Sequence, residues 1–249
     1  MSDRARLQVE RAHKRVRVMV GAETVADTTR PLLVWEKPYY PTYYFPEDDV
    51  RTELLVPTDE SRRSPSRGDA QVFTVKAGGG EAAGAAYAYP ESPIEQIRGH
   101  VAFDWKAMDH WFEEDEEVYV HPRDPYKRVD TLHSSRHVRI EVGGTTVAET
   151  HSPTLLFETG LPVRYYLPKT DVRMDLLVRS DSHTDCPYKG TAEYWSVNVD
   201  GESYPDIVWS YPFPTPESAK IAGLMSFYNE KVDVYVDGEL QGRPDTLFS

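Results

Sequence analysis

The chain makes a tight turn and then enters a strand in the stretch HTDCPYKGTAEYW, residues 183–195. Pro187 fixes one backbone angle of the turn, and Gly190 permits a left-handed one. The residues after the turn, 194–197, alternate in the manner of a β-strand. The stretch also holds the only cysteine of the chain, Cys186, close to Tyr188 and Lys189. It therefore predicts both a local fold and a candidate site.

The sequence contains this unit twice. A shift of 122 positions aligns residues 14–90 with 136–212 without a gap, and 28 of the 77 pairs are identical. Self-similarity of this kind predicts two copies of one domain. We assign residues 14–132 to an N-terminal repeat and 136–241 to a C-terminal repeat, with no long flexible linker between them. The two repeats could pack against each other as a pseudo-dimer.

Both repeats are predicted to be mainly β. Short apolar or alternating runs, separated by Gly and Pro turns, recur in the same order in each copy. Helical spacing follows only the capping box Ser92–Glu95 and the matching Thr215-Pro216. We expect two small antiparallel β domains, each with one short α-helix. The apolar runs should be largely buried, namely Leu33, Val34, Trp35, Leu54, Leu55, Leu155, Leu156, Phe157, Leu176 and Leu177.

Composition limits the partners and the location. The net charge of −13 would repel nucleic acid and anionic membranes. A single cysteine excludes an intramolecular disulfide and fits a reducing compartment. The sequence shows neither an apolar run long enough to span a membrane nor a secretory signal. We expect a cytoplasmic protein without nucleic-acid or membrane partners.

The two repeats differ at the turn. The first has Ser64-Pro65-Ser66-Arg67-Gly68, so the residues that shape the turn are retained while Cys, Tyr and Lys are not. Trp195 and Trp209 are likewise replaced by Phe73 and Tyr87 in the first repeat. These differences predict a site in the second repeat, with the equivalent place in the first repeat filled or shallow.

One interpretation of that site is a small-ligand pocket. In it, Arg173 and Lys189 bind an anionic ligand while Glu158 orients it. The remaining candidate contacts are aromatic, namely Tyr166, Tyr188, Trp195 and Trp209. Packing is the alternative for Tyr166, and a structural ion pair with Glu158 is the alternative for Arg173.

A second interpretation is an enzyme that uses Cys186 or Lys189. A nearby positive charge favours the thiolate, which is the nucleophilic form of cysteine. The alternative is that Cys186 is a small apolar plug and Lys189 a solvated surface residue. His183 and Cys186 supply at most two metal ligands, so we predict no metal site, and no pattern identifies a cofactor. The segment His121–Asp124 is either a structural turn or a wall of the second-repeat site.

A resemblance to a known family supports the doubled β domain. The motifs that carry it lie mainly in the second repeat, as Asp171-Val172-Arg173-Met174-Asp175-Leu176-Leu177, Cys186–Gly190, Tyr194-Trp195-Ser196 and Trp209-Ser210-Tyr211-Pro212. The chain resembles a tandem form of the bacterial and fungal domain of unknown function 427, which also carries a putative nucleotidyltransferase label. The resemblance implies a small curved antiparallel β domain of the β-tent kind and implies little about activity. Nucleotidyl transfer is a minor variant of the enzyme hypothesis, because the sequence has no spaced Asp-x-Asp after Gly-Ser and no Walker-type loop.

Overall fold

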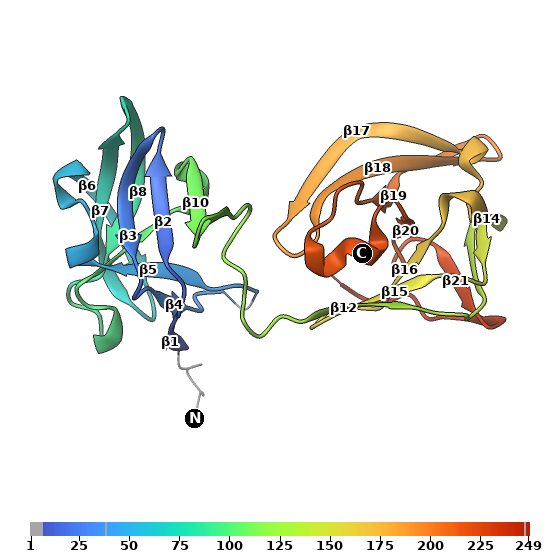
Figure 1. The fold of residues 1–249 in the computed structure, drawn as a ribbon, viewed down its shortest axis with the longest axis horizontal. Coiled ribbons are helices and arrows are strands. Elements are labelled where there is room, and N and C mark those ends of the chain that lie inside the picture. Colours follow the sequence, from blue (N-terminus) through green and yellow to red (C-terminus); the bar gives the residue numbers. More distant parts are fainter. Residues whose placement is uncertain (1–6, 38, 247) are drawn as a thin grey trace. The chain divides into compact units, whose positions relative to one another are not determined.

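The computed structural model describes residues 7–37, 39–246 and 248–249. The chain forms two compact units, of which one ends at Asp124 and the other begins at Pro125. Each unit contains one seven-stranded and one four-stranded sheet, and all paired strands within them are antiparallel (Figure 1). The prediction of a mainly β chain with two similar halves is confirmed.

The first unit contains the strands that the N-terminal repeat predicts. Its seven-stranded sheet has the order β1 (Val9–Arg11), β4 (Leu32–Val34), β5 (Thr42–Pro46), β9 (His100–Phe103), β8 (Gly80–Ala88), β7 (Gly68–Ala77) and β6 (Leu55–Ser64). Its four-stranded sheet has the order β11 (Glu116–Glu117), β10 (His110–Glu113), β2 (Val16–Val20) and β3 (Glu23–Thr28).

The second unit repeats this topology strand for strand. Its seven-stranded sheet has the order β12 (Val129–His133), β15 (Thr154–Glu158), β16 (Arg164–Leu167), β20 (Met225–Phe227), β19 (Glu202–Ser210), β18 (Gly190–Val199) and β17 (Leu177–Cys186). Its four-stranded sheet has the order β14 (Thr145–Thr150), β13 (Val138–Val142), β21 (Asp233–Val236) and β22 (Glu239–Leu240). A different strand order in the two copies would have contradicted the internal repeat.

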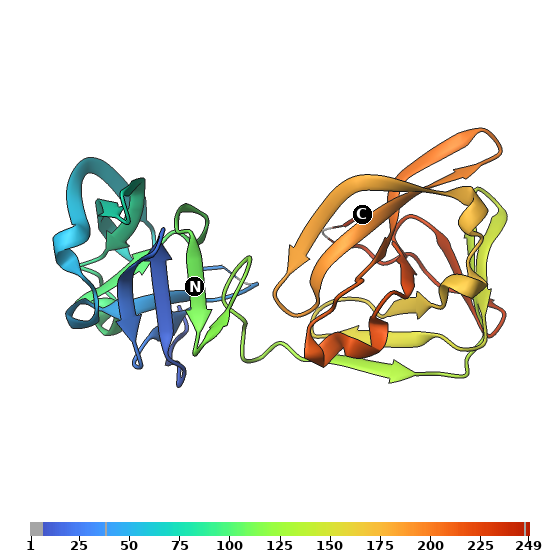
Figure 2. The same cartoon turned by 45° about the horizontal axis from the view of Figure 1, so that its top comes forward.

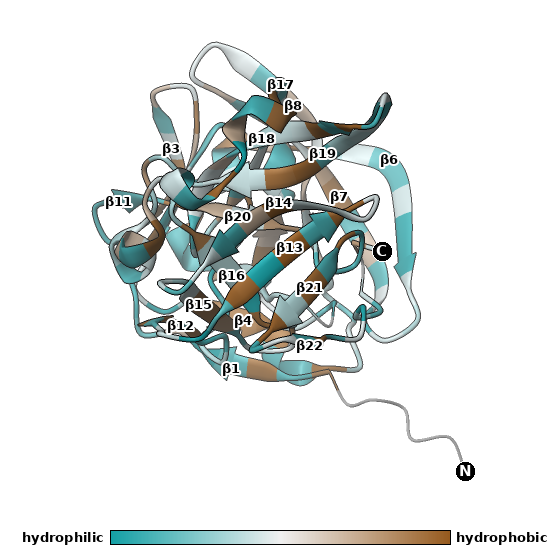
Figure 3. Ribbon diagram, turned by 90° about the vertical axis from the view of Figure 1, so that its right-hand side faces the viewer, coloured by the Kyte–Doolittle hydropathy of each residue, from teal (hydrophilic) through white to brown (hydrophobic). Residues whose placement is uncertain are grey.

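Alternation along the strands decides which face is buried. In β13, every second residue is buried, beginning with Val138, and Figure 3 shows the matching bands of hydrophobic and hydrophilic colour. In β5, Tyr43 and Phe45 face one core cluster while Tyr44 faces another. Successive side chains of a strand point to opposite faces, so each seven-stranded sheet has a core cluster on both sides.

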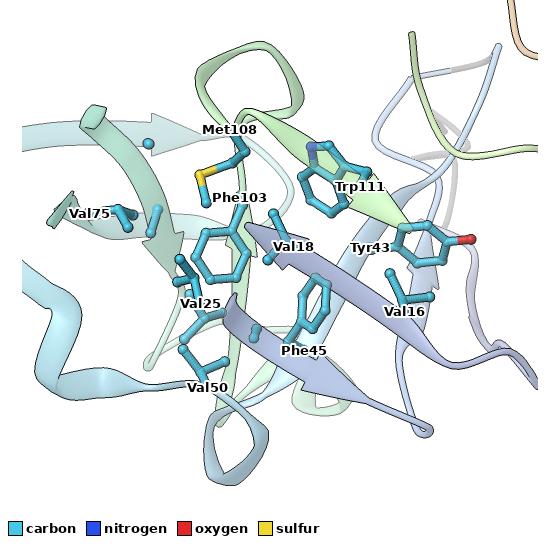
Figure 4. Packing of buried hydrophobic residues seen from close by; sticks show 14 of the residues in the cluster. Val16, Val18, Val25, Tyr43, Phe45, Val50, Val75, Phe103, Met108 and Trp111 are labelled. Carbon is cyan, nitrogen blue, oxygen red and sulfur yellow. The ribbon is translucent and has the colours of Figure 1, made fainter. Parts of the chain in front are cut away.

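The larger cluster of each unit joins its two sheets. In the first unit, Val16, Val18 and Val25 of the small sheet pack against Phe45 and Phe103 of the large one (Figure 4). The rings of Phe45 and Phe103 meet edge to face, with centroids 5.5 Å apart. This geometry is favourable for aromatic pairs in a dry core.

The hairpin β17–β18 carries the Cys186–Gly190 turn, and it forms a long curved ribbon (Figure 2). Cys186 pairs with Gly190 at its end, and the φ of Gly190 is +96°. The matching hairpin β6–β7 ends on Gly68 with a φ of +94°. Both glycines therefore adopt the left-handed conformation that the turn was predicted to need.

The predicted α-helices are replaced by 3₁₀ turns. The segments that were expected to be helical contain only η3 (Glu95–Ile97) and η7 (Pro216–Ile221). Gly99 and Gly223 follow these turns with a φ of +68° each, and β9 and β20 begin within two residues of them. The chain must reach its next strand at once, so no further helical turn can form. The remaining 3₁₀ turns are η1 (Glu47–Asp49), η2 (Thr52–Leu54), η4 (Trp105–Ala107), η5 (Lys169–Asp171) and η6 (Met174–Leu176).

Two further expectations differ from the structure. The strand Val129–His133 pairs with β15, so residues that we assigned to the end of the first repeat form an edge of the second unit's sheet. Phe157 is 39% exposed and Leu54, Leu55, Leu176 and Leu177 are only half-buried, whereas Leu155 and Leu156 are buried as expected. None of the helices in the described residues is long and apolar enough to cross a membrane.

Candidate functional site

The Cys186–Gly190 turn is tied to the segment that follows β19. The carbonyl oxygen of Tyr188 accepts hydrogen bonds from the hydroxyls of Thr215, at 2.6 Å, and Ser218, at 3.1 Å. A Cβ atom on Gly190 would lie 3.0 Å from the carbonyl oxygen of Phe213. These contacts fix the turn, so the side chains that it carries have defined positions.

An ion pair joins this turn to strand β15. Lys189 Nζ lies 2.5 Å from Glu158 Oε2, and the two side chains are only 12% and 10% exposed. The same pair exists in the first repeat, where Arg67 binds Glu36 and the hydroxyl of Tyr44 donates to Glu36 at 2.5 Å. The cation differs between the repeats while the pairing is kept. A nearly buried glutamate–cation pair is thus a property of the domain and not of one copy.

Burial and the glutamate together set the ionisation of the first-repeat pair. Burial raises the pKa of Tyr44, and the charge of Glu36 raises it further. Burial lowers the pKa of Arg67, but the attraction to Glu36 outweighs this and the net pKa is raised. The Tyr44 phenol is therefore neutral and Arg67 is charged.

Arg173 is not part of this arrangement. It is 57% exposed and binds Asp175 at 2.6 Å, and hydrogen bonding to that carboxylate raises its pKa. The matching Arg51 binds Glu23 and Glu53 instead of Glu36. The alternative in which Arg173 forms an ion pair with Glu158 is wrong, and Arg173 and Lys189 bind different carboxylates. The cause is local, because each arginine precedes a 3₁₀ turn that brings a nearby acidic side chain within reach.

The other predicted residues are divided between the two faces of the sheet. Tyr166 and Trp209 lie together, with the indole Nε1 donating to the Tyr166 hydroxyl at 3.0 Å. Burial is the main cause that raises the pKa of Tyr166, and the nearby Cys186 and Glu158 raise it further. Trp195 packs in the opposite cluster, where Lys169 lies 5.5 Å from its ring. The structure therefore groups Cys186, Lys189, Glu158, Tyr166 and Trp209 on one face and separates Trp195 from them.

A buried ion pair in the second repeat escaped the sequence analysis. Arg164 makes two hydrogen bonds of 2.7 Å to Glu230, and these side chains are 8% and 0% exposed. The hydroxyl of Thr246 also donates to Glu230 at 2.7 Å. The guanidinium lies within 6 Å of three ring centroids, those of Trp209, Tyr228 and Phe248. The only signal in the sequence was a charged residue at the start of an otherwise apolar and aromatic strand, since its partner is 66 positions away.

A cavity of about 450 Å³ lies in the first repeat. Its walls are aromatic and charged, and they are formed by Glu36, Lys37, Tyr40, Pro41, Thr42, Tyr43, Arg62, Arg67, Tyr87, Tyr89, Phe103, Asp104, Trp105, Lys106, Trp111, Val120 and Pro122. The Glu36–Arg67 pair thus borders this space. The expectation that the equivalent place in the first repeat is filled or shallow is wrong.

Two substitutions distinguish the repeats beside this cavity. Thr42 in β5 occupies the position of Arg164 in β16. Lys106 occupies the position of Glu230, because the two residues lie in matching turns. In the first repeat, the backbone N–H of Ala107 donates to the carbonyl oxygen of Asp104 and closes the turn. In the second repeat, the N–H of Lys231 donates to the carbonyl oxygen of Tyr228. Where the second repeat holds a buried ion pair, the first has a short threonine and an exposed lysine at the edge of open space.

Pro122 and Val120 form part of the wall of the first-repeat cavity, and the His121 ring stacks on Tyr40 with centroids 4.0 Å apart.

In the second repeat, an open hollow of about 260 Å³ borders Glu158 and is lined by Arg128, Asp130, Phe157, Thr159, Leu161 and Val163. The described residues contain no group of three or more His, Cys, Asp or Glu side chains placed to hold a metal ion.

Comparison with known proteins agrees with the doubled architecture. No curated protein matches the chain. The model of one family matches twice, over residues 8–114 and 130–238, and the two matches together cover most of the chain. The chain therefore belongs to the family described as a domain of unknown function, DUF427, and carries that domain in tandem.

Proposed function

We propose that this protein binds a small ligand in the cavity of its first repeat. The observation that carries the proposal is the contrast between the repeats. One fold is built twice, and the positions that hold the buried Arg164–Glu230 pair in the second copy border an open cavity in the first. A structural role for the domain does not require that space to be open.

The cavity has the size of a small-molecule site. Such sites usually measure roughly 300–1,000 Å³, with apolar and aromatic walls and a few polar groups that orient the ligand. The volume of about 450 Å³ falls within this range. Aromatic rings form most of its apolar wall, and the Glu36–Arg67 pair supplies fixed polar groups.

The Cys186–Gly190 turn is the second candidate location, because Glu158 joins its Lys189 to the edge of an open hollow. An enzyme that uses Cys186 or Lys189 is the alternative function. It is less well supported, because the ammonium of Lys189 is already bound by Glu158. Nucleotidyl transfer usually needs carboxylates that hold Mg²⁺, and the described part of the chain has no group of three or more His, Cys, Asp or Glu side chains placed to hold a metal ion. The β-tent relationship, a bacterial origin and a cytoplasmic location remain predictions from the sequence.

A double variant tests the location of the site. Thr42→Arg with Lys106→Glu should place in the first repeat the ion pair that fills the second, and so close the cavity. We expect this variant to lose binding of aromatic fragments that the wild-type protein binds. Ligand-observed NMR with a mixture of anionic, neutral and cationic aromatic fragments would measure this, with the melting temperature as a check on folding.

The matched control is Lys76→Gln, which changes net charge by the same amount at an exposed lysine paired with Glu81. It should bind the fragments as the wild type does. Binding that survives in the closed variant and disappears in Lys189→Ala would move the site to the second repeat. A wild-type protein that binds none of the fragments would contradict the proposed function.

A further inference from the structure

The lining of the first-repeat cavity is unusual in its charge. It contains four cationic side chains, Lys37, Arg62, Arg67 and Lys106, and two carboxylates, Glu36 and Asp104. The chain as a whole has a net charge of −13. Positive charge is therefore concentrated at this cavity against the trend of the molecule, and an unequal balance of this kind favours a ligand of the opposite sign.

The carboxylates of the lining are already engaged within the protein. Glu36 accepts from Arg67 and from the Tyr44 hydroxyl. Asp104 accepts a hydrogen bond of 3.0 Å from the backbone N–H of Lys106, which caps the turn η4. Glu36 is therefore held by two protein donors, and Asp104 uses one carboxylate oxygen to cap η4, so the four cations outnumber the two carboxylates of the lining.

Two of the cations are not engaged in ion pairs. Arg62 binds Glu60 at 2.8 Å and Arg67 binds Glu36. Lys37 and Lys106, by contrast, have no ion-pair partner among the residues that the structure describes, and the Lys37 ammonium lies 5.7 Å from the centroid of the Tyr40 ring. Both lysines are exposed, so their ammonium groups are free to move onto a bound anion.

The apolar part of the wall suits a flat ring. The indoles of Trp105 and Trp111 stack at 4.3 Å with an angle of 7° between their planes. Tyr87 and Tyr89 meet edge to face at 5.9 Å. Aromatic rings prefer offset-stacked or edge-to-face contact with further rings, so these walls favour an aromatic or heteroaromatic group over a flexible chain.

We propose that the ligand of the first repeat is an aromatic anion, with its ring against the aromatic wall and its carboxylate or phosphate between Lys37 and Lys106. This inference rests on the proposed small-ligand function and adds the chemical class. The Glu36–Arg67 pair forms the fixed polar wall beside the ring. The second repeat does not take this ligand, because Glu230 stands where Lys106 stands in the first.

A matched set of probes tests the class in the full-length protein. 3-Phenylpropionate, 2-phenylethyl phosphate, 3-phenylpropanol and 3-phenylpropylammonium share one ring and a similar chain but differ in charge. Isothermal titration calorimetry at low salt should show that at least one of the two anions binds about tenfold more tightly than the alcohol, and that the cation binds most weakly. The tighter anion identifies the head group as carboxylate or phosphate.

Two variants connect the preference to the lysines. Lys106→Ala and Lys37→Ala should each weaken binding of the anion by about fivefold, as expected for a partly exposed ion pair, and leave the alcohol unchanged. Lys76→Ala should change neither. Equal or tighter binding of the alcohol or the cation would overturn the proposed class while leaving small-ligand binding intact. If none of the four probes binds, the class is contradicted, and retained binding of other fragments in the wild type would show that the proposed function survives.

Discussion

Replacing Glu230 with alanine should destabilise the second repeat by about 3–5 kcal/mol, because it leaves the Arg164 guanidinium buried without its partner. The carboxylate is 0% exposed and accepts three hydrogen bonds of 2.7 Å. Urea unfolding followed by tryptophan fluorescence would measure the change. The control is Asp175→Ala, which breaks the solvent-exposed pair with Arg173 and should leave the stability nearly unchanged.

A second variant separates the cost of an unpaired charge from the value of the pair. Arg164→Met with Glu230→Leu removes both charges and retains most of the volume, so it should restore most of the lost stability. A loss below about 1 kcal/mol in Glu230→Ala, or a double variant as unstable as the single one, would contradict the account of a buried and tightly coupled pair.

The same pair predicts a dependence on pH. Burial raises the pKa of Glu230, but hydrogen bonds from Arg164 and Thr246 outweigh it and hold the pKa below the usual value of 4.5. A carboxyl group whose pKa is lowered by folding stabilises the protein above its unfolded-state pKa. This contribution is lost as the pH falls through the folded-state value. Wild-type protein should therefore lose more stability on acidification below pH 4.5 than Arg164→Met with Glu230→Leu does.

Replacing Phe45 with alanine should have an effect of similar size in the first repeat, about 3–5 kcal/mol. Its side chain is fully buried and contacts the rings of Phe103 and Trp111. Each unit has its own core clusters, so this variant should shift the unfolding of the first unit and Glu230→Ala that of the second. Phe213→Ala is the control, because Phe213 is 91% exposed and should contribute within about 0.5 kcal/mol. If Phe45→Ala also lowered the free energy of unfolding by only about 0.5 kcal/mol, the aromatic cluster would not be what holds the two sheets together.

The sequence predicted the architecture because the information for it is local or repeated. Strand alternation around Val138 and the Pro–Gly turn at residues 187–190 are visible in a few consecutive residues, and the repeat supplied each signal twice. The prediction of α-helices failed for a reason that a few consecutive residues cannot show. The capping box at Ser92 is followed by a strand that must pair with β5, and this tertiary demand overrides the local preference.

The candidate site was less predictable, because it depends on which side chains fill a given volume. The comparison of repeats followed the reactive groups Cys186 and Lys189 and so pointed to the second copy. The proposed location of the site depends on Thr42 and Arg164, which are a short and a long side chain at the same position of the two repeats. Nothing in the sequence marks Thr42 as the edge of a cavity. The partner of Arg164 is likewise set by the fold, 66 residues away.

The central claim is that ligand binding belongs to the first repeat. The chain has five tryptophans, and each gives one indole N–H resonance in a ¹⁵N–¹H correlation spectrum. Trp105 and Trp111 line the cavity, whereas Trp195 and Trp209 lie in the second repeat. Titration with 3-phenylpropionate or 2-phenylethyl phosphate should shift the resonances of Trp105 and Trp111 and leave those of Trp195 and Trp209 in place. Shifts confined to Trp195 or Trp209 would contradict the claim and place the site in the second repeat.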